Sequence, residues 1–293
     1  VLALIGAERV NRTVAALLGA AVIVSLGVVE QERAASEFID WNTIGLLAGM
    51  MVIVAILDRT GIFEYLAIKS AQWGRARPGR ILVILALVTA FLSAFLDNVT
   101  TVILMVPVTF LIADALGMSP VPFLLTQVFA SNIGGASTLI GDPPNILIGS
   151  AAGLSFMDFV VNMAPVVVLS LVPALAFLYF VFRGEFRSDK RARETIEQMD
   201  ARGAIRDPVL LRRSLIVLSL VIAAFFLHGL LHLEAATIAL FGAAGLMLYA
   251  RANVEEVLRE VGRPLHYTDI TELALEAGYL KTRGRTPHNT MRA

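Results

Sequence analysis

The feature that most constrains this chain is a long apolar run, residues 81–182, that is interrupted by two polar clusters. The charged residues of the run are all acidic: Asp97, Asp114, Asp142 and Asp158. Asp97 and Asp142 lie inside the clusters, and the run holds no lysine or arginine to neutralise them. An unpaired carboxylate inside a bilayer costs about 2.5–3.5 kcal/mol on insertion scales, so it is protonated, paired with a cation or facing water. The run therefore predicts an ion or solute site in a membrane protein.

Composition supports the same class of protein. Hydrophobic residues make up 57% of the 293 residues and charged residues 16%, with a mean hydropathy of +0.75. Soluble domains carry about 25% charged residues. The net charge is zero, so no global field favours nucleic acid, and the lack of cysteine excludes disulfides and thiolate metal sites. The chain starts at Val1 with an apolar stretch and no charged n-region, so we expect the remnant of a longer segment rather than a signal peptide.

Eight apolar segments are predicted to cross or enter the membrane as helices. Several are shorter than the roughly 20 apolar residues that span a bilayer. Short, interrupted segments are typical of the re-entrant or broken helices that line transporter sites. We therefore predict an all-α polytopic membrane protein, with segments at 13–29, 41–57, 81–96, 99–113, 121–140, 159–182, 214–231 and 235–250.

Basic residues set the predicted orientation. The positive-inside rule places Arg9 and Arg12, the basic cluster within 69–80, and the loop 183–213 in the cytoplasm. An even number of crossings must then lie between the last two of these regions. Two solutions satisfy this parity and both stay open: a re-entrant hairpin with its tip at Asp97, or four ordinary crossings.

The stretch 62–73 also has two readings. Its sequence, IFEYLAIKSAQW, puts Phe63, Leu66 and Ala67 on one side of a helix. This pattern fits a helix that lies at the membrane interface. It fits an extension of the preceding membrane segment equally well.

The first polar cluster is built from Asp97, Asn98, Thr100 and Thr101. At the tip of a buried hairpin, the asparagine and threonine side chains either satisfy free backbone groups at helix ends or bind a solute directly. The C-terminal end of a helix and a carboxylate both attract cations. Asp97 is therefore a candidate for coupling to a proton or a cation, and the alternative is a capping cluster without a ligand.

The second polar cluster predicts a broken helix. Two adjacent glycines permit a tight turn, and two adjacent prolines end any helix that arrives from the preceding residues. Pro143 then suits the first position of a new helix, with Asp142 as its cap. Unwound backbone at membrane depth is tolerated where it lines a cavity or is buried in protein; the alternative is an ordinary loop outside the membrane. The candidate residues are Ser131, Asn132, Gly134, Gly135, Thr138, Gly141, Asp142, Pro143 and Asn145.

One pair of histidines has a spacing that is compatible with a metal. His228 and His232 are four residues apart, with Glu234 nearby. Structural and catalytic zinc sites need three or four protein ligands. We therefore expect a segment end at the interface here, and no structural metal site.

Both clusters lie in stretches that resemble a known family. AFLDNVTTVILMVPVT and FASNIGGASTLIGDPPNILIGSAAGLSFMDFVVNMAP are similar to the arsenite-permease and sodium/proton-antiporter branch of the ion-transporter superfamily, whose domain is called citrate-transporter-like. The resemblance implies the first of two inverted repeats, with a re-entrant hairpin and a broken helix. It places the hairpin motif on Asp97, Asn98, Thr100 and Thr101, and the broken-helix motif on the nine residues from Ser131 to Asn145 given above.

The resemblance also implies ligands and partners. Relatives hold a coupling cation between the hairpin tip and the helix break, which puts a sodium ion near Asn98 and Asn132. The partners it implies are a lipid bilayer, a small inorganic or organic ion, and a second copy of the chain in a homodimer. No organic cofactor is expected; Na⁺ or H⁺ is the coupling ion. Nucleic acid is not an expected partner.

The chain is expected to divide in two. Residues 1–261 carry the transporter resemblance, and the tail 262–293 resembles the start of a HARE helix-turn-helix domain, with a short helix expected at 270–276. A weak repeat links VAALLGAA at 14–21 with TIALFGAA at 237–244. A second hairpin and a second broken helix do not follow it, so we expect a truncated or fused reading frame.

These observations predict a transporter and not an enzyme. The expected function is secondary active transport of a small anion or oxyanion, of the arsenite, antimonite or citrate type, coupled to a cation or proton. The expected location is the cell membrane, with several passes. Two alternatives remain: a sodium/proton antiporter, and an inactive truncated or fused fragment.

Overall fold

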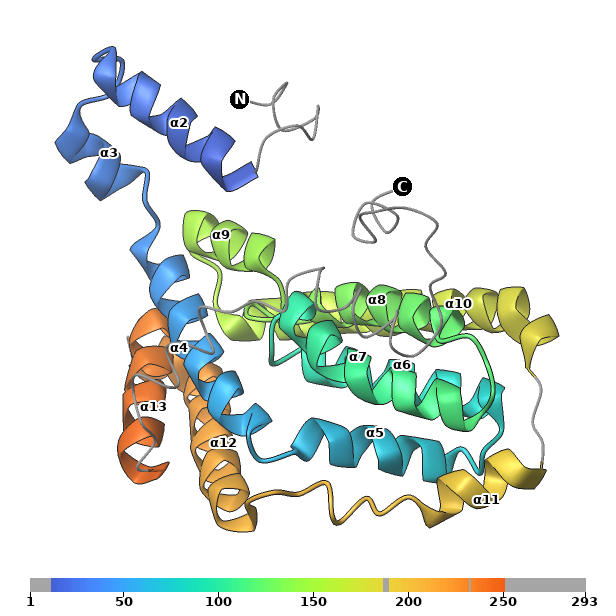
Figure 1. Cartoon of the computed structure of the whole chain (residues 1–293). Coiled ribbons are helices and arrows are strands. Elements are labelled where there is room, and N and C mark those ends of the chain that lie inside the picture. Colours follow the sequence, from blue (N-terminus) through green and yellow to red (C-terminus); the bar gives the residue numbers. More distant parts are fainter. Residues whose placement is uncertain (1–11, 187–189, 232, 251–293) are drawn as a thin grey trace, which may run out of the picture. The chain divides into compact units, whose positions relative to one another are not determined.

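The computed structural model describes residues 12–186, 190–231 and 233–250, and the regular elements in these ranges are all helices (Figure 1). The chain divides into two compact units, Val1–Trp41 and Asn42–Ala293. The expected tail helix at 270–276 lies outside the described residues. The all-α architecture predicted from the sequence is confirmed.

The N-terminal unit begins with helix α2, Arg12–Ser25, which is shorter than the segment expected at 13–29. Gly27 explains the early end, because it adopts a left-handed φ of 66°. The amide of Val28 then donates back to the carbonyl of Ile23 over 3.2 Å, which closes the helix end. At 14 residues, α2 is about 21 Å long and falls short of the bilayer core.

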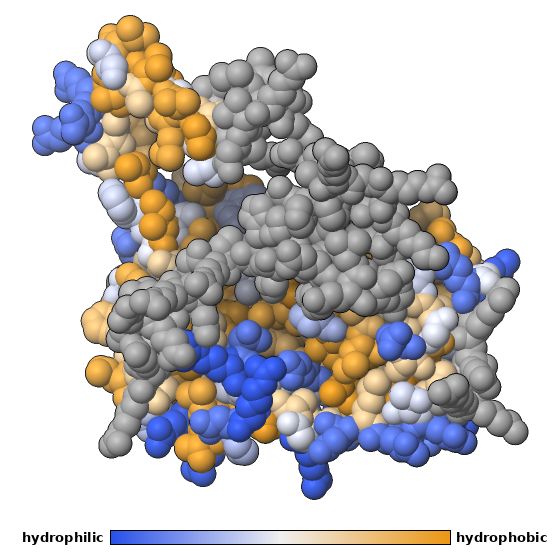
Figure 2. Space-filling model, in the orientation of Figure 1, coloured by the Kyte–Doolittle hydropathy of each residue, from blue (hydrophilic) through white to orange (hydrophobic). Residues whose placement is uncertain are grey.

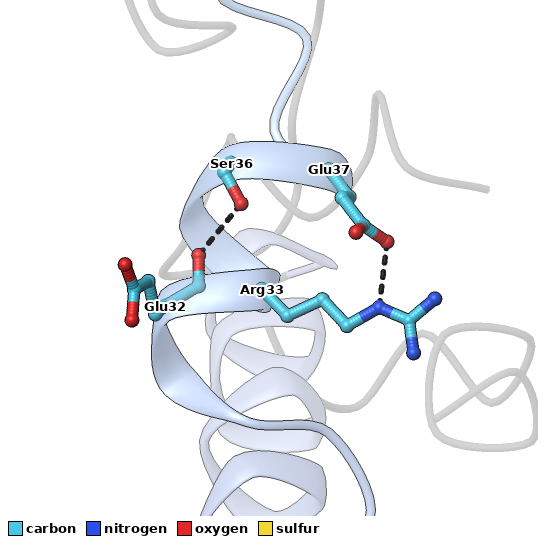
Figure 3. Close-up of polar contacts among 4 residues, drawn as sticks. All are labelled: Glu32, Arg33, Ser36 and Glu37. Carbon is cyan, nitrogen blue, oxygen red and sulfur yellow. Dashed lines mark hydrogen bonds and ion pairs between the residues drawn. The ribbon is translucent and has the colours of Figure 1, made fainter.

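A short helix, α3 at Gln31–Glu37, occupies what the sequence indicated as an acidic loop. Figure 3 shows its two local contacts, both between residues four apart. Arg33 Nε lies 2.6 Å from Glu37 Oε2, and Ser36 Oγ donates to the carbonyl of Glu32 over 2.9 Å. Exposed pairs of this kind contribute about 0.3–0.5 kcal/mol, so α3 is a marginal helix.

Four helices are long and apolar enough to cross a membrane, and three shorter apolar helices accompany them in the described ranges. This finding confirms a multi-pass membrane protein. The four are α4 (Trp41–Asp58), α7 (Asn98–Ala115), α10 (Phe156–Phe182) and α12 (Pro208–Leu231); the shorter ones are α2, α6 (Pro78–Ser93) and α13 (Ala235–Ala250).

The surface of the larger unit fits a lipid environment. Leu169 on α10 is 76% exposed, and Phe241 and Leu248 on α13 are 75% and 81% exposed. Figure 2 shows hydrophobic side chains across the unit and polar ones along its lower edge, where Figure 1 places α5 (Ile62–Trp73) and α11 (Lys190–Gln198). An apolar belt above a polar edge is the pattern of a protein whose lower edge faces water.

Helix α5 is a separate helix, which excludes the reading of 62–73 as an extension of α4. A turn at 59–61 divides them, and Gly61 adopts a left-handed φ of 77°. On α5, Phe63, Ala67 and Ala71 are buried on one face, as expected for a helix that packs on its neighbours α6 and α7.

The polar segment that follows α10 packs against α5. Gln72 Nε2 donates to the carbonyl of Met199 over 2.9 Å, and the Arg206 amide donates to the carbonyl of Thr60 over 3.0 Å. Arg206 also pairs with Glu64. Two of the three predicted cytoplasmic regions therefore lie on the same side of the unit, as the charge pattern required.

Small residues allow α4 and α13 to approach closely. Gly45 and Gly49 lie one turn apart on α4 and face Ala236 and Ala239 of α13. A Cβ added at Gly49 would lie 2.6 Å from the Ala239 carbonyl carbon, so the contact is between backbones. Small residues at this spacing are a common device for packing helices in membranes.

Two helices begin earlier than the hydrophobic pattern indicated, because side chains cap them. α10 was expected from residue 159 but starts at Phe156, where Ser155 Oγ accepts from the Asp158 amide over 3.1 Å. α12 was expected from residue 214 but starts at Pro208, where Asp207 accepts from two backbone amides over 2.9 Å. Asp158 also bonds back to Ser155, so it completes the cap of α10.

Candidate functional site

The first polar cluster lies at the turn of a helical hairpin. Helix α6 ends at Ser93, the turn covers residues 94–97, and α7 begins at Asn98. At its other end α6 packs against the end of α10, where Gly79 meets the rings of Tyr179 and Phe186. The turn and the basic side of the unit therefore lie at opposite ends of α6.

Asp97 caps the second helix of the hairpin. Its Oδ1 accepts a hydrogen bond of 2.8 Å from the amide of Thr100, with the Asp97 backbone extended. Thr100 thus contributes its backbone amide to the cluster. The capping role expected as the alternative is real, and it engages one oxygen of the carboxylate.

The second polar cluster is a break between two helices. Helix α8, Val121–Gly135, ends before the segment expected to reach residue 140, and α9 is Pro143–Ala152. Pro143 begins α9, as expected. Asp142 stands at the N-cap position with extended backbone, but its side chain makes no capping hydrogen bond. The expected cap is therefore wrong, and the Asp142 carboxylate is not engaged by the start of α9.

Glycine lets the break press against the hairpin. A Cβ added at Gly134 would lie 2.3 Å from the carbonyl oxygen of Ala90 on α6. A Cβ at Gly141 would lie 2.4 Å from the carbonyl oxygen of Gly135 and 2.6 Å from that of Ser93. These distances are too short for any side chain, so the glycines allow direct backbone contact between α6 and the break.

Hydrogen bonds join the two clusters. Ser93 Oγ donates to the carbonyl of Ser131 over 2.7 Å, and Asn98 Nδ2 donates to Asn132 Oδ1 over 3.1 Å. The hydroxyl of Thr138 donates to the carbonyl of Ala94. The hairpin turn and the helix break therefore form one structure.

The break is also held from within. Asn145 Nδ2 donates to the carbonyls of Thr138 and Gly135 over 2.9 and 3.4 Å. The Gly141 amide donates to Thr138 Oγ1 over 3.2 Å. Asn145 and Thr138 thus replace helical hydrogen bonds that the unwound backbone has lost, which is what buried irregular backbone requires.

This arrangement brings two carboxylates together. Asp97 and Asp142 are both half-buried, and they are close enough for their charges to repel each other. Asp114, by contrast, is exposed near the end of α7. With no basic residue between 81 and 182, the compensating charge for the pair must come from outside this run.

Two neutral oxygens next to the pair are buried without a partner. Among the residues that the structure describes, Asn98 Oδ1 and Thr101 Oγ1 have no hydrogen-bond partner. Asn98 is 8% exposed and Thr101 is fully buried. Carboxylate, amide and hydroxyl oxygens are ligands for hard cations. The chemistry of this donor set suits a proton or a small alkali cation.

The described ranges contain no group of three or more histidine, cysteine or acidic side chains placed to hold a metal ion. His228 lies in the last turn of α12, whereas His232 lies outside the described residues. The sodium position expected near Asn98 and Asn132 coincides with the hydrogen bond between these two side chains.

Sequence reasoning missed the contribution of α6. Ser93 and the backbone of Ala90 and Ala94 provide half of the contacts between the clusters. The one available signal was Ser93, a small polar residue a turn before Asp97 in an otherwise apolar helix.

Comparison with known proteins supports the resemblance for both parts of the chain. Residues 2–265 match the citrate transporter family. Residues 252–293 match the HARE-HTH family, a helix-turn-helix domain described from ASXL and restriction endonuclease proteins. The second match is confined to the end of the chain and overlaps the first.

Relatives of known name span more than this chain. It is 45% identical over 262 residues to a 46 kDa membrane protein of Mycobacterium leprae, and 44% identical to an uncharacterized transporter of Mycobacterium tuberculosis. Each alignment covers 88% of this chain and 61% of the relative. The human P protein is 32% identical, with 88% of this chain and 40% of that protein covered. These matches, with the family match over most of its length, show that the chain belongs to the citrate transporter family.

Proposed function

We propose that the chain is a cation-coupled secondary transporter of a small anion, acting in the cell membrane. The observation that carries this proposal is the pair Asp97 and Asp142, held together where the hairpin turn meets the helix break. Two like charges in a run without basic residues create a demand for a bound cation or proton. Membership of the citrate transporter family supports the transport role.

Helix lengths support a position inside the bilayer. α6 has 16 residues and α8 has 15, so they extend about 24 and 22 Å. Both start near the basic edge, since the turn after α7 and the end of α10 line one pocket at Gly117 and Gly184. A hydrocarbon core is about 30 Å thick, so both helices end within it. We infer that α6 and α7 form a re-entrant hairpin.

The same pair explains how transport of an anion is coupled. Two carboxylates repel an anionic substrate, so it approaches once a cation or proton has neutralised them. The cation would use Asn98 Oδ1 and Thr101 Oγ1, which have no protein partner among the described residues. The nearby start of α9 then offers the positive end of a helix dipole to the anion. Citrate-like carboxylates and arsenite- or antimonite-type oxyanions are the substrate classes we propose.

Flux into proteoliposomes tests the proposal. The purified chain and, as a full-length reference, the Mycobacterium leprae relative are reconstituted separately, and uptake of citrate and arsenite is measured with and without sodium or pH gradients. Gradient-dependent uptake by the chain supports the proposal. Uptake by the relative alone would reject autonomous transport and favour the inactive-fragment alternative.

A second candidate is sodium/proton antiport, because the paired carboxylates can hold either ion. A pH-sensitive dye inside the same vesicles separates the two functions. Sodium is placed outside the vesicles, and no anion substrate is present. Alkalinisation of the lumen as sodium enters and protons leave would favour antiport over anion transport.

A further inference from the structure

A second set of buried polar side chains lies between α7 and α8, away from the paired aspartates. Thr109 and Gln127 are both fully buried. Thr109 Oγ1 lies 2.7 Å from the carbonyl oxygen of Met105 and 3.0 Å from Gln127 Oε1. A hydroxyl has one hydrogen, so it donates to one of these acceptors and not to both. Within the described ranges Gln127 Nε2 has no partner either, so this pair is incompletely satisfied.

This pair belongs to a row that begins at the ion site. Asn98, Thr101, Met105 and Thr109 follow one another at three- and four-residue spacing, which places them on one face of α7. Both ends of the row contact α8: Asn98 bonds to Asn132, and Thr109 contacts Gln127. The row extends about 16 Å along the helix.

Three buried polar atoms in and beside this row lack a protein partner among the residues described: Asn98 Oδ1, Thr101 Oγ1 and Gln127 Nε2. The first accepts hydrogen bonds, the second both donates and accepts, and the third donates. A cation alone is repelled by the amide nitrogen, and an anion alone by the amide oxygen. Water satisfies all three, since it donates and accepts and typically makes two to four hydrogen bonds when buried.

We propose that the α7–α8 interface binds a row of water molecules that runs from Asn98 and Thr101 to Gln127. The row leads from the paired aspartates towards the end of α7 that lies on the basic side of the unit. Hydration of this interface does not depend on any transported solute. Its use as the path by which a proton or cation reaches Asp97 rests on the proposed function.

Radiolytic hydroxyl labelling with mass spectrometry tests the proposal, because bound water generates radicals next to the side chain it touches. Met105 is the probe: it is fully buried and lies on the row. Met50, which is 7% exposed on α4, is the matched methionine. In the purified full chain we expect Met105 to be labelled about tenfold faster than Met50. Equal protection of the two would overturn the proposal without the use of any variant.

Variants then assign the water to the row. Gln127→Leu and Thr101→Val should each slow the labelling of Met105 several-fold and leave Met50 unchanged. Thr126→Val is the control, since Thr126 is equally buried on α8 but donates to the carbonyl of Pro122 over 2.7 Å. Unchanged labelling in both row variants would contradict the proposal. Labelling reads the water whether or not the vesicles show flux, so it fails or succeeds separately from the proposed function.

Discussion

Asn98 donates a hydrogen bond to Asn132 over 3.1 Å, and this bond joins the first residue of α7 to the last turn of α8. It is a direct side-chain link between the hairpin turn and the helix break. Asn132 in turn donates to the carbonyl of Val128 over 2.8 Å, so its amide is fixed in orientation. The geometry of the paired aspartates on either side depends on this link.

Removing the link should destabilise the protein. Asn132→Ala leaves the buried Asn98 amide without its partner, which costs about 1–3 kcal/mol in the free energy of unfolding. Asn162→Ala is the matched control, because Asn162 makes a similar bond to the Asp158 carbonyl on the exposed face of α10. Thermal unfolding in detergent should show a lower Tm for Asn132→Ala alone. Equal melting of the two variants would show that the link carries no stability.

A methyl group at Gly134 should separate α6 from α8. Its Cβ would meet backbone atoms of Ala90, which cannot rotate away, so Gly134→Ala is expected to lower the free energy of unfolding by about 1–3 kcal/mol. Gly245→Ala on α13 has nothing within 4 Å and should gain up to about 1 kcal/mol from helix propensity. Opposite shifts of Tm in the two variants are the expected result; shifts of the same sign would contradict close contact at Gly134.

The segment after α11 should come loose when Gln72 is replaced. Gln72→Ala removes the hydrogen bond to Met199, worth about 1 kcal/mol, so the exposed population of this segment should rise about fivefold. Trypsin cleavage at Arg202 or Arg206 reports that population, and an unchanged cleavage rate would contradict the prediction. Glu197→Ala is the control: it removes an exposed pair with Arg193 on α11 and should leave the cleavage rate as it is.

Much of the candidate site could be predicted from the sequence because its chemistry is local. Adjacent prolines at 143 and 144 end a helix wherever they stand, and acidic residues in an apolar run indicate a site wherever the helices pack. The hairpin turn at Asp97 and the break before Pro143 were predicted for these reasons. The capping role of Asp142 was wrong, because its backbone takes the cap position while its side chain does not engage the amides.

Other features depend on which elements meet in space. Ser93 bonds to Ser131 only because α8 ends beside α6, and no pattern in the sequence specifies that meeting. Gly45 and Gly49 form a visible small-residue motif, but its partner on α13 is remote in the chain, and the pairing itself is tertiary. The early start of α12 had a local signal in Asp207 followed by proline, which hydrophobicity alone overlooks.

The central claim is that the meeting point of the hairpin turn and the helix break binds a cation, and sodium-dependent stability tests it most directly. Tm is measured at constant ionic strength while choline is replaced by sodium, for the unsubstituted chain, Asp97→Asn and Asp114→Asn. Asparagine keeps the helix cap at position 97 and removes the charge. At a sodium concentration about 100 times the dissociation constant, binding stabilises the folded state by about 2.7 kcal/mol. The account predicts that the unsubstituted chain and Asp114→Asn gain stability with sodium while Asp97→Asn does not; an equal gain in Asp97→Asn would contradict it.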